Sequence, residues 1–295
     1  MAAALAWPRE EERQGVMALA RELELPAPVH APLERALEAM PELSAAGLTD
    51  PETAGAAWEK LSKVLPAWHE DDGMSQLAVT LSAARLTRGI YRENHISDDV
   101  YQATMACLCR FLGETHEITG KWAFDRGFWT WRQTSGQLFR LGTLEFEYRL
   151  LGDIPPTGAL TQESPVLSVH IPSDAALSRE ELERSYGLAA DFFREHEKIL
   201  CRYGAPEAVL CGSWLMSPAL DELLPADSGI RRFAGGYTRY DVQEDDQSFY
   251  RWLFGSLGPT GNLPERTGLQ RAVKAHLAAG GKIGMAWGIL RAASL

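Results

Sequence analysis

The stretch that decides the fold is residues 143–150, TLEFEYRL, because the spacing of apolar residues changes there. Leu144, Phe146, Tyr148 and Leu150 alternate with polar or charged residues. This period of two is typical of a strand with one face toward water. The sequence therefore predicts a sheet from about this point onward.

The residues before this stretch have the features of helices. Apolar side chains between residues 74 and 91 recur at Leu77, Leu81 and Ala84, which is helical spacing. Ser97, followed by two aspartates, is a typical helix N-cap. We expect an all-helical domain over residues 1–120.

The second domain is expected to span residues 121–295. Its first segment, WTW at 129–131, alternates like a strand, and Gly136 would then form a hairpin turn before residues 143–150. Further strands are predicted at 166–171, 208–216, 237–242 and 283–289, with helices after Ser178, after Ser217, at 248–254 and after Thr267. The predicted fold class is α+β, with an α/β-like second half.

Composition narrows the possible functions of these 295 residues. A formal net charge of −11 disfavours nucleic acid and anionic membranes as partners. No apolar run is long enough for a membrane-spanning helix, and the first residues lack the basic segment of a signal peptide. The four cysteines have no metal or redox spacing, so we expect reduced thiols in a cytoplasmic protein without a metal.

Four stretches, in order, carry a resemblance to a known family: residues 138–147, 169–172, 211–218 and 263–271, LFRLGTLEFE, VHIP, CGSWLMSP and LPERTGLQR. They resemble the GNAT-like C-terminal domain that bacterial acyltransferases carry behind a helical N-acyltransferase N-terminal domain. The resemblance implies a mixed-sheet, GNAT-like second domain. It also implies an enzyme that transfers an acyl group from acetyl-CoA or a longer acyl-CoA to an amine of a small molecule or peptide.

The same resemblance places the cosubstrate beside the strand at 166–171. GNAT domains hold the acyl-CoA thioester against a splayed central strand and bind its pyrophosphate at the following loop and helix N-terminus. That implies cofactor-binding roles for Ile171, Ser173, Asp174, Ser178 and Arg179. The usual Arg/Gln-x-x-Gly-x-Gly/Ala loop is missing there. A non-catalytic ligand-binding or regulatory module with a degenerate GNAT fold is therefore the alternative.

Several side chains have the chemistry of an N-acyl transfer. His170 is a candidate general base near neutral pH, and Glu145, with Glu147 beside it, is a second candidate. The competing interpretations are a half-buried histidine bonded to backbone and a solvated strand face bearing two glutamates. A pocket is expected between the strands at 166–171 and 208–216, with His170 and Ser213, a further catalytic candidate, near its lining.

Two further residues complete the candidate set. Cys211, which shares a strand face with Ser213, is a nucleophile only if a histidine lies close, and packing is the commoner role of a buried thiol. Tyr237 would be the general acid that reprotonates the leaving thiolate, a role that the resemblance supplies.

Overall fold

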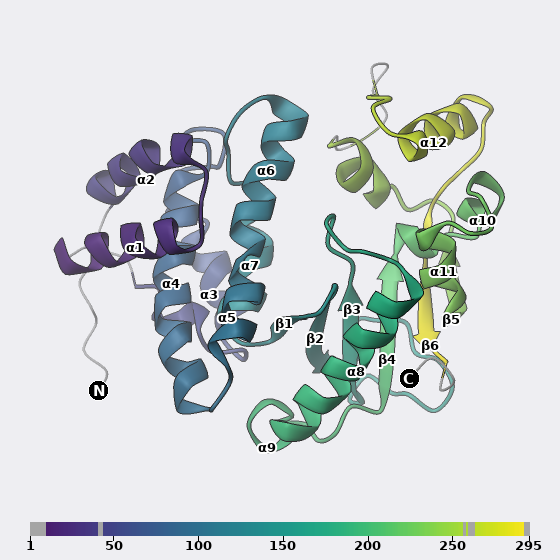
Figure 1. Ribbon diagram of the computed structural model, residues 1–295, viewed down its shortest axis with the longest axis horizontal. Helices are drawn as coiled ribbons and strands as arrows, with labels where there is room; N and C mark the ends of the chain where they lie inside the picture. The colour runs from purple at the N-terminus through teal and green to yellow at the C-terminus, as the bar shows by residue number, and fades with distance from the viewer. Residues whose placement is uncertain (1–9, 41–43, 256–257, 259–262, 292–295) are drawn as a thin grey trace. The chain divides into compact units, whose positions relative to one another are not determined.

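The computed structural model describes residues 10–40, 44–255, 258 and 263–291. The chain divides into two compact units, Met1–Phe139 and Arg140–Leu295, and each is described by itself (Figure 1). The units divide further along the chain than the boundary expected at residue 120.

The first unit is helical, as predicted. Helix α4 is its centre, since it contacts α1, α2, α5 and α7, and nearly every side chain from Met74 to Ala84 is buried. Ser97 caps α5 by accepting a hydrogen bond from the Val100 amide. The helices in the described ranges are α1 (Glu10–Glu22), α2 (Ala27–Ala39), η1 (Ala46–Leu48), α3 (Ala54–Leu61), α4 (Met74–Glu93), α5 (Asp98–Met105), α6 (Cys107–Thr119) and α7 (Gly127–Thr134).

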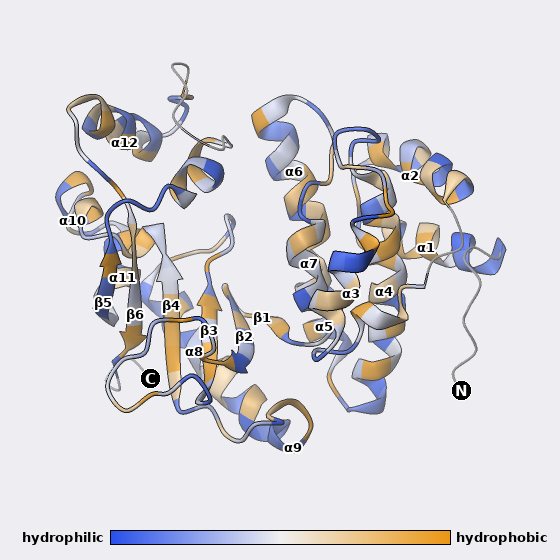
Figure 2. Cartoon of the chain, turned by 180° about the vertical axis from the view of Figure 1, so that it is seen from behind, coloured by the Kyte–Doolittle hydropathy of each residue, from blue (hydrophilic) through white to orange (hydrophobic). Residues whose placement is uncertain are grey.

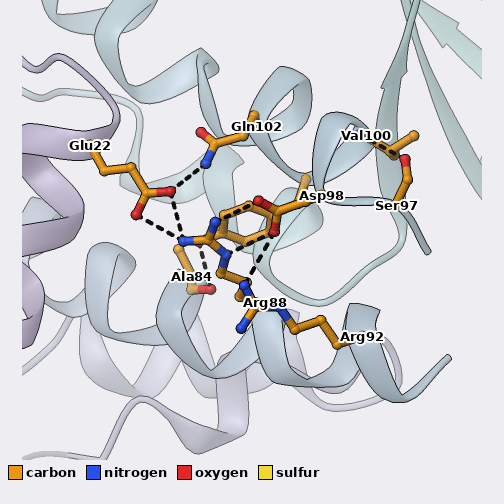
Figure 3. A network of polar contacts seen from close by, with 9 residues as sticks. Glu22, Ala84, Arg88, Arg92, Ser97, Asp98, Val100 and Gln102 are labelled. Atoms are coloured by element: carbon orange, nitrogen blue, oxygen red, sulfur yellow. Dashed lines mark hydrogen bonds and ion pairs between the residues drawn. The ribbon is translucent and has the colours of Figure 1, made fainter. Parts of the chain in front are cut away.

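One guanidinium joins three of these helices (Figure 3). Arg88, on α4, bonds Glu22 of α1 at 2.7 Å and Asp98 of α5 through Nε at 2.9 Å. Gln102 donates to the same Glu22 carboxylate at 2.6 Å. The Arg88 guanidinium also lies 5.1 Å from the centre of the Tyr101 ring. The network holds α1 and α5 against α4.

Helix α7 corrects the strand predicted at 129–131. Its buried residues are Gly127, Thr130, Gln133 and Thr134, which recur at helical spacing, whereas Trp129 and Trp131 are only partly buried. The alternation of tryptophan and threonine was therefore misleading, because the small and polar residues face the core. Residue 136 also differs from its prediction: this glycine, at φ +69°, follows the end of α7 and is not a hairpin turn.

The second unit is built on a six-stranded mixed sheet in the order β1-β2-β3-β4-β6-β5. Strands β2 and β3 are antiparallel, β3 and β4 are parallel, and β6 is antiparallel to both β4 and β5. Figure 2 shows hydrophobic residues along β3, β4 and β6. The strands are β1 (Leu138–Leu141), β2 (Leu144–Leu150), β3 (Pro165–His170), β4 (Ala208–Ser213), β5 (Tyr237–Gln243) and β6 (Met285–Leu290).

Strand β2 is a strand, as predicted, but the expectation of one solvated face is wrong. Glu145 and Glu147 are 3% and 2% exposed, so both faces are buried up to Tyr148. The strand predicted at 208–216 is also shorter. It ends at Ser213, whose hydroxyl accepts a hydrogen bond from the Leu215 amide and starts the 3-10 turn η2 (Trp214–Met216).

The remaining helices include those predicted after Ser178, after Ser217, near 248–254 and after Thr267, together with two that were not predicted, at Glu197–Leu200 and Gly229–Gly235. Thr267 and Gln270 form the predicted capping box of α12. At Gly288 in β6 a Cβ atom would meet the Tyr237 Cβ at 2.9 Å, so this position leaves no room for a larger side chain. The helices are α8 (Arg179–Glu195), α9 (Glu197–Leu200), α10 (Ala219–Leu223), α11 (Gly229–Gly235), the π-helical turn η3 (Tyr250–Phe254) and α12 (Gly268–Ala278).

Candidate active site

His170 and Glu147 form a hydrogen-bonded pair at the carboxyl end of β3. Nε2 of His170 lies 2.8 Å from the Glu147 carboxylate. The Glu147 side chain is 3% exposed, and the His170 side chain is 23% exposed. An imidazole that is held by a buried carboxylate and is itself partly accessible is suited to take a proton from a substrate.

Glu145 belongs to the same face of the sheet. In the antiparallel register it lies opposite His170, while Glu147 lies opposite Ser168. Directly opposed residues of a β-ladder project to one side, so the two glutamates, Ser168 and His170 share a face. The structure therefore brings together two of the predicted catalytic residues, His170 and Glu145, with Glu147 next to them on the same face.

The parallel strands β3 and β4 separate at this histidine. Their paired register runs from Val166 and Ala208 to Ser168 and Leu210. Beyond that point β3 continues beside β2 as far as His170, and β4 continues beside β6 as far as Ser213. The facing edges of β3 and β4 are therefore no longer paired beyond Ser168 and Leu210. Diverging strand edges offer main-chain amides and carbonyls to an extended ligand.

Ser213 is not brought to His170. Leu167 is paired with Val209, so Val209, Cys211 and Ser213 project to the side opposite His170. The Ser213 hydroxyl is used as a cap, 3.1 Å from the Leu215 amide. Cys211 is fully buried, and burial raises the pKa of its thiol to about 12, which keeps it protonated at neutral pH.

Tyr237 lies on the same side as Cys211 and is 1% exposed. Its hydroxyl is 2.8 Å from that of Tyr186 on α8. Burial raises the pKa of Tyr237 well above its ordinary value, and it raises that of Tyr186 too. Both phenols therefore stay protonated at neutral pH. The contact between Tyr186 and Tyr237 was not predicted from the sequence.

The loop from β3 to α8 carries the predicted cofactor-binding residues Ile171, Ser173, Asp174, Ser178 and Arg179. The Ser178 hydroxyl caps α8 by accepting from the Glu181 amide at 3.2 Å. The Asp174 carboxylate lies 2.9 Å from Nη1 of Arg140. The side chain of Arg179 is 83% exposed and paired with Glu183 at 2.7 Å. These polar groups mainly stabilise the loop and the helix start.

The described part of the second unit includes two cavities that bear on the site. One, of about 310 Å³, is apolar and lies between α8 and the sheet, with Phe146, Leu167, Tyr186, Phe193 and Val209 in its wall. The other, of about 400 Å³, is lined by arginines from the segments after β4. Sequence reasoning missed the arginine cavity because its arginines are spread over the chain from Arg231 to Arg291. The adjacent pair Arg231-Arg232 was the available signal.

Neither a metal site nor a membrane span is found in the part of the chain that the structure describes. No three His, Cys, Asp or Glu side chains within it are grouped as a metal ion would require. None of its helices is both long enough and apolar enough to cross a membrane.

Two family models match the chain, one over the helical unit and one over the unit that contains the mixed sheet. Residues 138–290 match the model of the GNAT-like C-terminal domain, and residues 4–136 match that of the N-acyltransferase N-terminal domain. The chain belongs to this family of N-acyltransferases. The family predicted from the sequence is thereby confirmed.

Solved structures of similar fold are acyltransferases. A crystal structure of an acyltransferase with decanoyl-CoA and teicoplanin is 24% identical, with TM-score 0.73, over 98% of this chain and 90% of that chain. Another, of an acyltransferase with CoA and 10C-teicoplanin, is 23% identical with TM-score 0.74, over 99% and 91%. A mutant acyltransferase with octanoyl-CoA is equally similar, at 23% identity and TM-score 0.74, over 99% and 91%. A search of curated proteins found no matching relative.

Proposed function

We propose that the chain transfers a medium-length acyl group from acyl-CoA to an amine of a glycopeptide, by direct attack within a ternary complex. The observation that carries this proposal is the His170–Glu147 pair, placed where β3 and β4 separate. The similar structures with octanoyl-CoA, decanoyl-CoA and teicoplanin supply the substrate classes.

The residues at the separated strands fit an acyl-CoA. A thioester arm in the gap between β3 and β4 would reach from the α8 side of the sheet to the side that bears His170. The divergent strand edges supply main-chain donors and acceptors for the amides of that arm. The arm brings the thioester carbonyl to the general base without need of the missing glycine loop.

His170 accepts one proton in the proposed reaction. As the amine nitrogen forms its bond to the acyl carbon and the C–S bond breaks, the imidazole takes the proton from the amine. The Glu147 carboxylate orients the ring and stabilises the imidazolium that results. The departing sulfur takes up a proton, for which Tyr237 remains the predicted donor. Because its hydroxyl is buried against Tyr186, that role requires access from the gap.

An acyl group longer than acetyl is proposed because the similar structures hold octanoyl-CoA and decanoyl-CoA. Each methylene that such a group buries contributes about 0.8 kcal/mol. The apolar cavity under α8 is not assigned to the acyl group, since it lies across the sheet from His170 and near the amino end of β4. We further propose a cytoplasmic location, which suits a CoA-dependent enzyme and is supported by the four free cysteines.

The proposal is tested by measuring thiol release from acetyl-, octanoyl- and decanoyl-CoA, with and without a teicoplanin-type acceptor. We expect turnover that depends on the acceptor and rises with chain length, and an amide product by mass spectrometry. Absence of turnover and of acyl-CoA binding across the panel would instead support the non-catalytic ligand-binding module.

A further inference from the structure

The arginine-lined cavity of the second unit contains an excess of positive charge. It lies among α10, α11, β5 and the residue after β6. Figure 1 shows these elements close to one another. Four arginines and one aspartate line it: Arg231, Arg232, Arg239, Arg291 and Asp221. In a chain of net charge −11, such a local excess of cations is not explained by composition.

Only one of the four guanidiniums has a carboxylate partner among the described residues. Arg239 binds Asp221 through both terminal nitrogens, one of them at 2.9 Å. Arg239 chiefly, with a smaller contribution from Arg231, lowers the pKa of Asp221 below its ordinary value, so this carboxylate is ionised and already engaged. The aspartate therefore balances one charge of the four.

The other three arginines bind main-chain carbonyls. Arg231 donates to Leu224 O at 3.2 Å, and Arg291 donates to Tyr237 O at 3.1 Å. Arg232 donates to Leu177 O and Asp227 O, each at 3.0 Å. A guanidinium has five N–H donors, so each keeps donors for a ligand. Guanidiniums that are anchored by one or two neutral acceptors are suited to bind phosphate oxygens.

The cavity lies on the α8 side of the sheet, opposite the proposed base. Tyr237 lines it and reaches Tyr186 of α8. Arg239 is opposed to Gly288 of β6, which is opposed to Cys211 of β4, so Arg239 projects to the same side as that thiol. Arg232 binds the last residue before the α8 cap. The cavity is thus beside the start of α8, and across the sheet from His170.

We infer that this cavity binds the diphosphate and 3′-phosphate end of acyl-CoA. The inference rests on the proposed function and deepens it, because it locates the ligand's charged end outside the β3–α8 loop. The first turn of α8 carries Glu180 and Glu181, which repel a phosphate, and its Arg179 is already paired with Glu183. With the phosphates at α11, the arm would run between the separated strands toward His170.

Calorimetric titration of the full chain tests this inference, with CoA and adenosine 3′,5′-bisphosphate as probes. Arg231→Gln and Arg291→Gln should each weaken binding of both probes by about 5- to 20-fold, since each removes a charge-assisted hydrogen bond. The double variant should lose more than either single variant, and Arg231→Lys should lose less than Arg231→Gln. In the wild type, affinity should fall as salt is raised.

Arg184→Gln is the matched control, because it removes an arginine of the same unit that is exposed, paired with Glu181 and assigned to no site. It should bind both probes as the wild type does. Unchanged CoA affinity in the Arg231→Gln/Arg291→Gln double variant, or a larger loss in Arg179→Gln, which probes the β3–α8 loop, would overturn the inference and leave the proposed function standing. A wild-type chain that binds neither CoA nor acyl-CoA would overturn the proposed function itself. Circular dichroism of every variant confirms that the fold is kept.

Discussion

Replacing Glu147 by glutamine tests whether the buried carboxylate serves His170. The two side chains meet at 2.8 Å, and Glu147 is only 3% exposed, so solvent weakens their interaction little. Glutamine keeps the size and one hydrogen bond but removes the charge that stabilises an imidazolium. A charge-assisted hydrogen bond is worth about 1.5–3 kcal/mol, which corresponds to about a 10- to 150-fold lower kcat. Loss of the base itself, in His170→Ala, should lower kcat by about 10²- to 10⁴-fold.

The assay measures kcat and KM for decanoyl-CoA with a saturating teicoplanin-type acceptor, together with thermal unfolding of each variant. We expect kcat to fall in Glu147→Gln while KM for the acyl-CoA changes little, because the interaction grows only as the proton moves. In the Glu147→Gln/His170→Ala double variant the two effects should not add. Equal kcat in the wild type and Glu147→Gln, or full additivity, would refute the reasoning and assign the pair to structure.

Three further outcomes follow from the geometry. In native protein at pH 8 a thiol reagent should modify Cys109 slowly and leave Cys211 unmodified, because burial raises the pKa of both thiols and encloses the second; rapid modification of Cys211 would contradict its burial. Arg88→Ala should cost the helical unit about 1 kcal/mol after solvent screening, measured by urea unfolding. Hydrogen bonding to Arg88 lowers the pKa of Asp98 in the folded state, so this stabilisation is present at neutral pH and lost as pH falls below about 4; an Arg88→Ala variant should not show that loss. Gly73→Ala should cost about 3 kcal/mol, since φ is +74° and the added Cβ would lie 1.8 Å from the Phe124 carbonyl oxygen; an unchanged urea midpoint would argue against this close approach.

Periodicity predicted most elements of the second unit because their core positions are apolar. It failed in α7, where the residues that face the core are Gly127, Thr130 and Gln133, and no hydropathy pattern marks such a face. The alternating pattern of β2 also predicted that Glu145 and Glu147 are exposed to solvent, which is wrong. Charged side chains are rarely buried, so a sequence alone favours exposure, and only the fold reveals the histidine that accompanies Glu147.

The candidate site was predicted only in part, for a reason of topology. His170 could be proposed from its place at the end of a strand, but its partner lies 23 positions earlier, and only the β2–β3 register brings the two together. Ser213 was expected near the lining of the same pocket as His170, whereas strand parity directs its side chain to the opposite face of the sheet. The arginine cavity depends on positions from 231 to 291, which no local motif connects.

The order of the strands has a consequence for synthesis on the ribosome. Strand β6, the last element, lies between β4 and β5, so both neighbours lack a partner on that side until Met285–Leu290 has emerged. The helical unit, complete by Phe139, can form while the second half is still being translated. Between the synthesis of β5 and that of β6 a nascent chain therefore carries two open strand edges, and these are the surfaces that a chaperone would need to shield. The sheet in the order β1-β2-β3-β4-β6-β5 therefore cannot be complete before β6 has been synthesised.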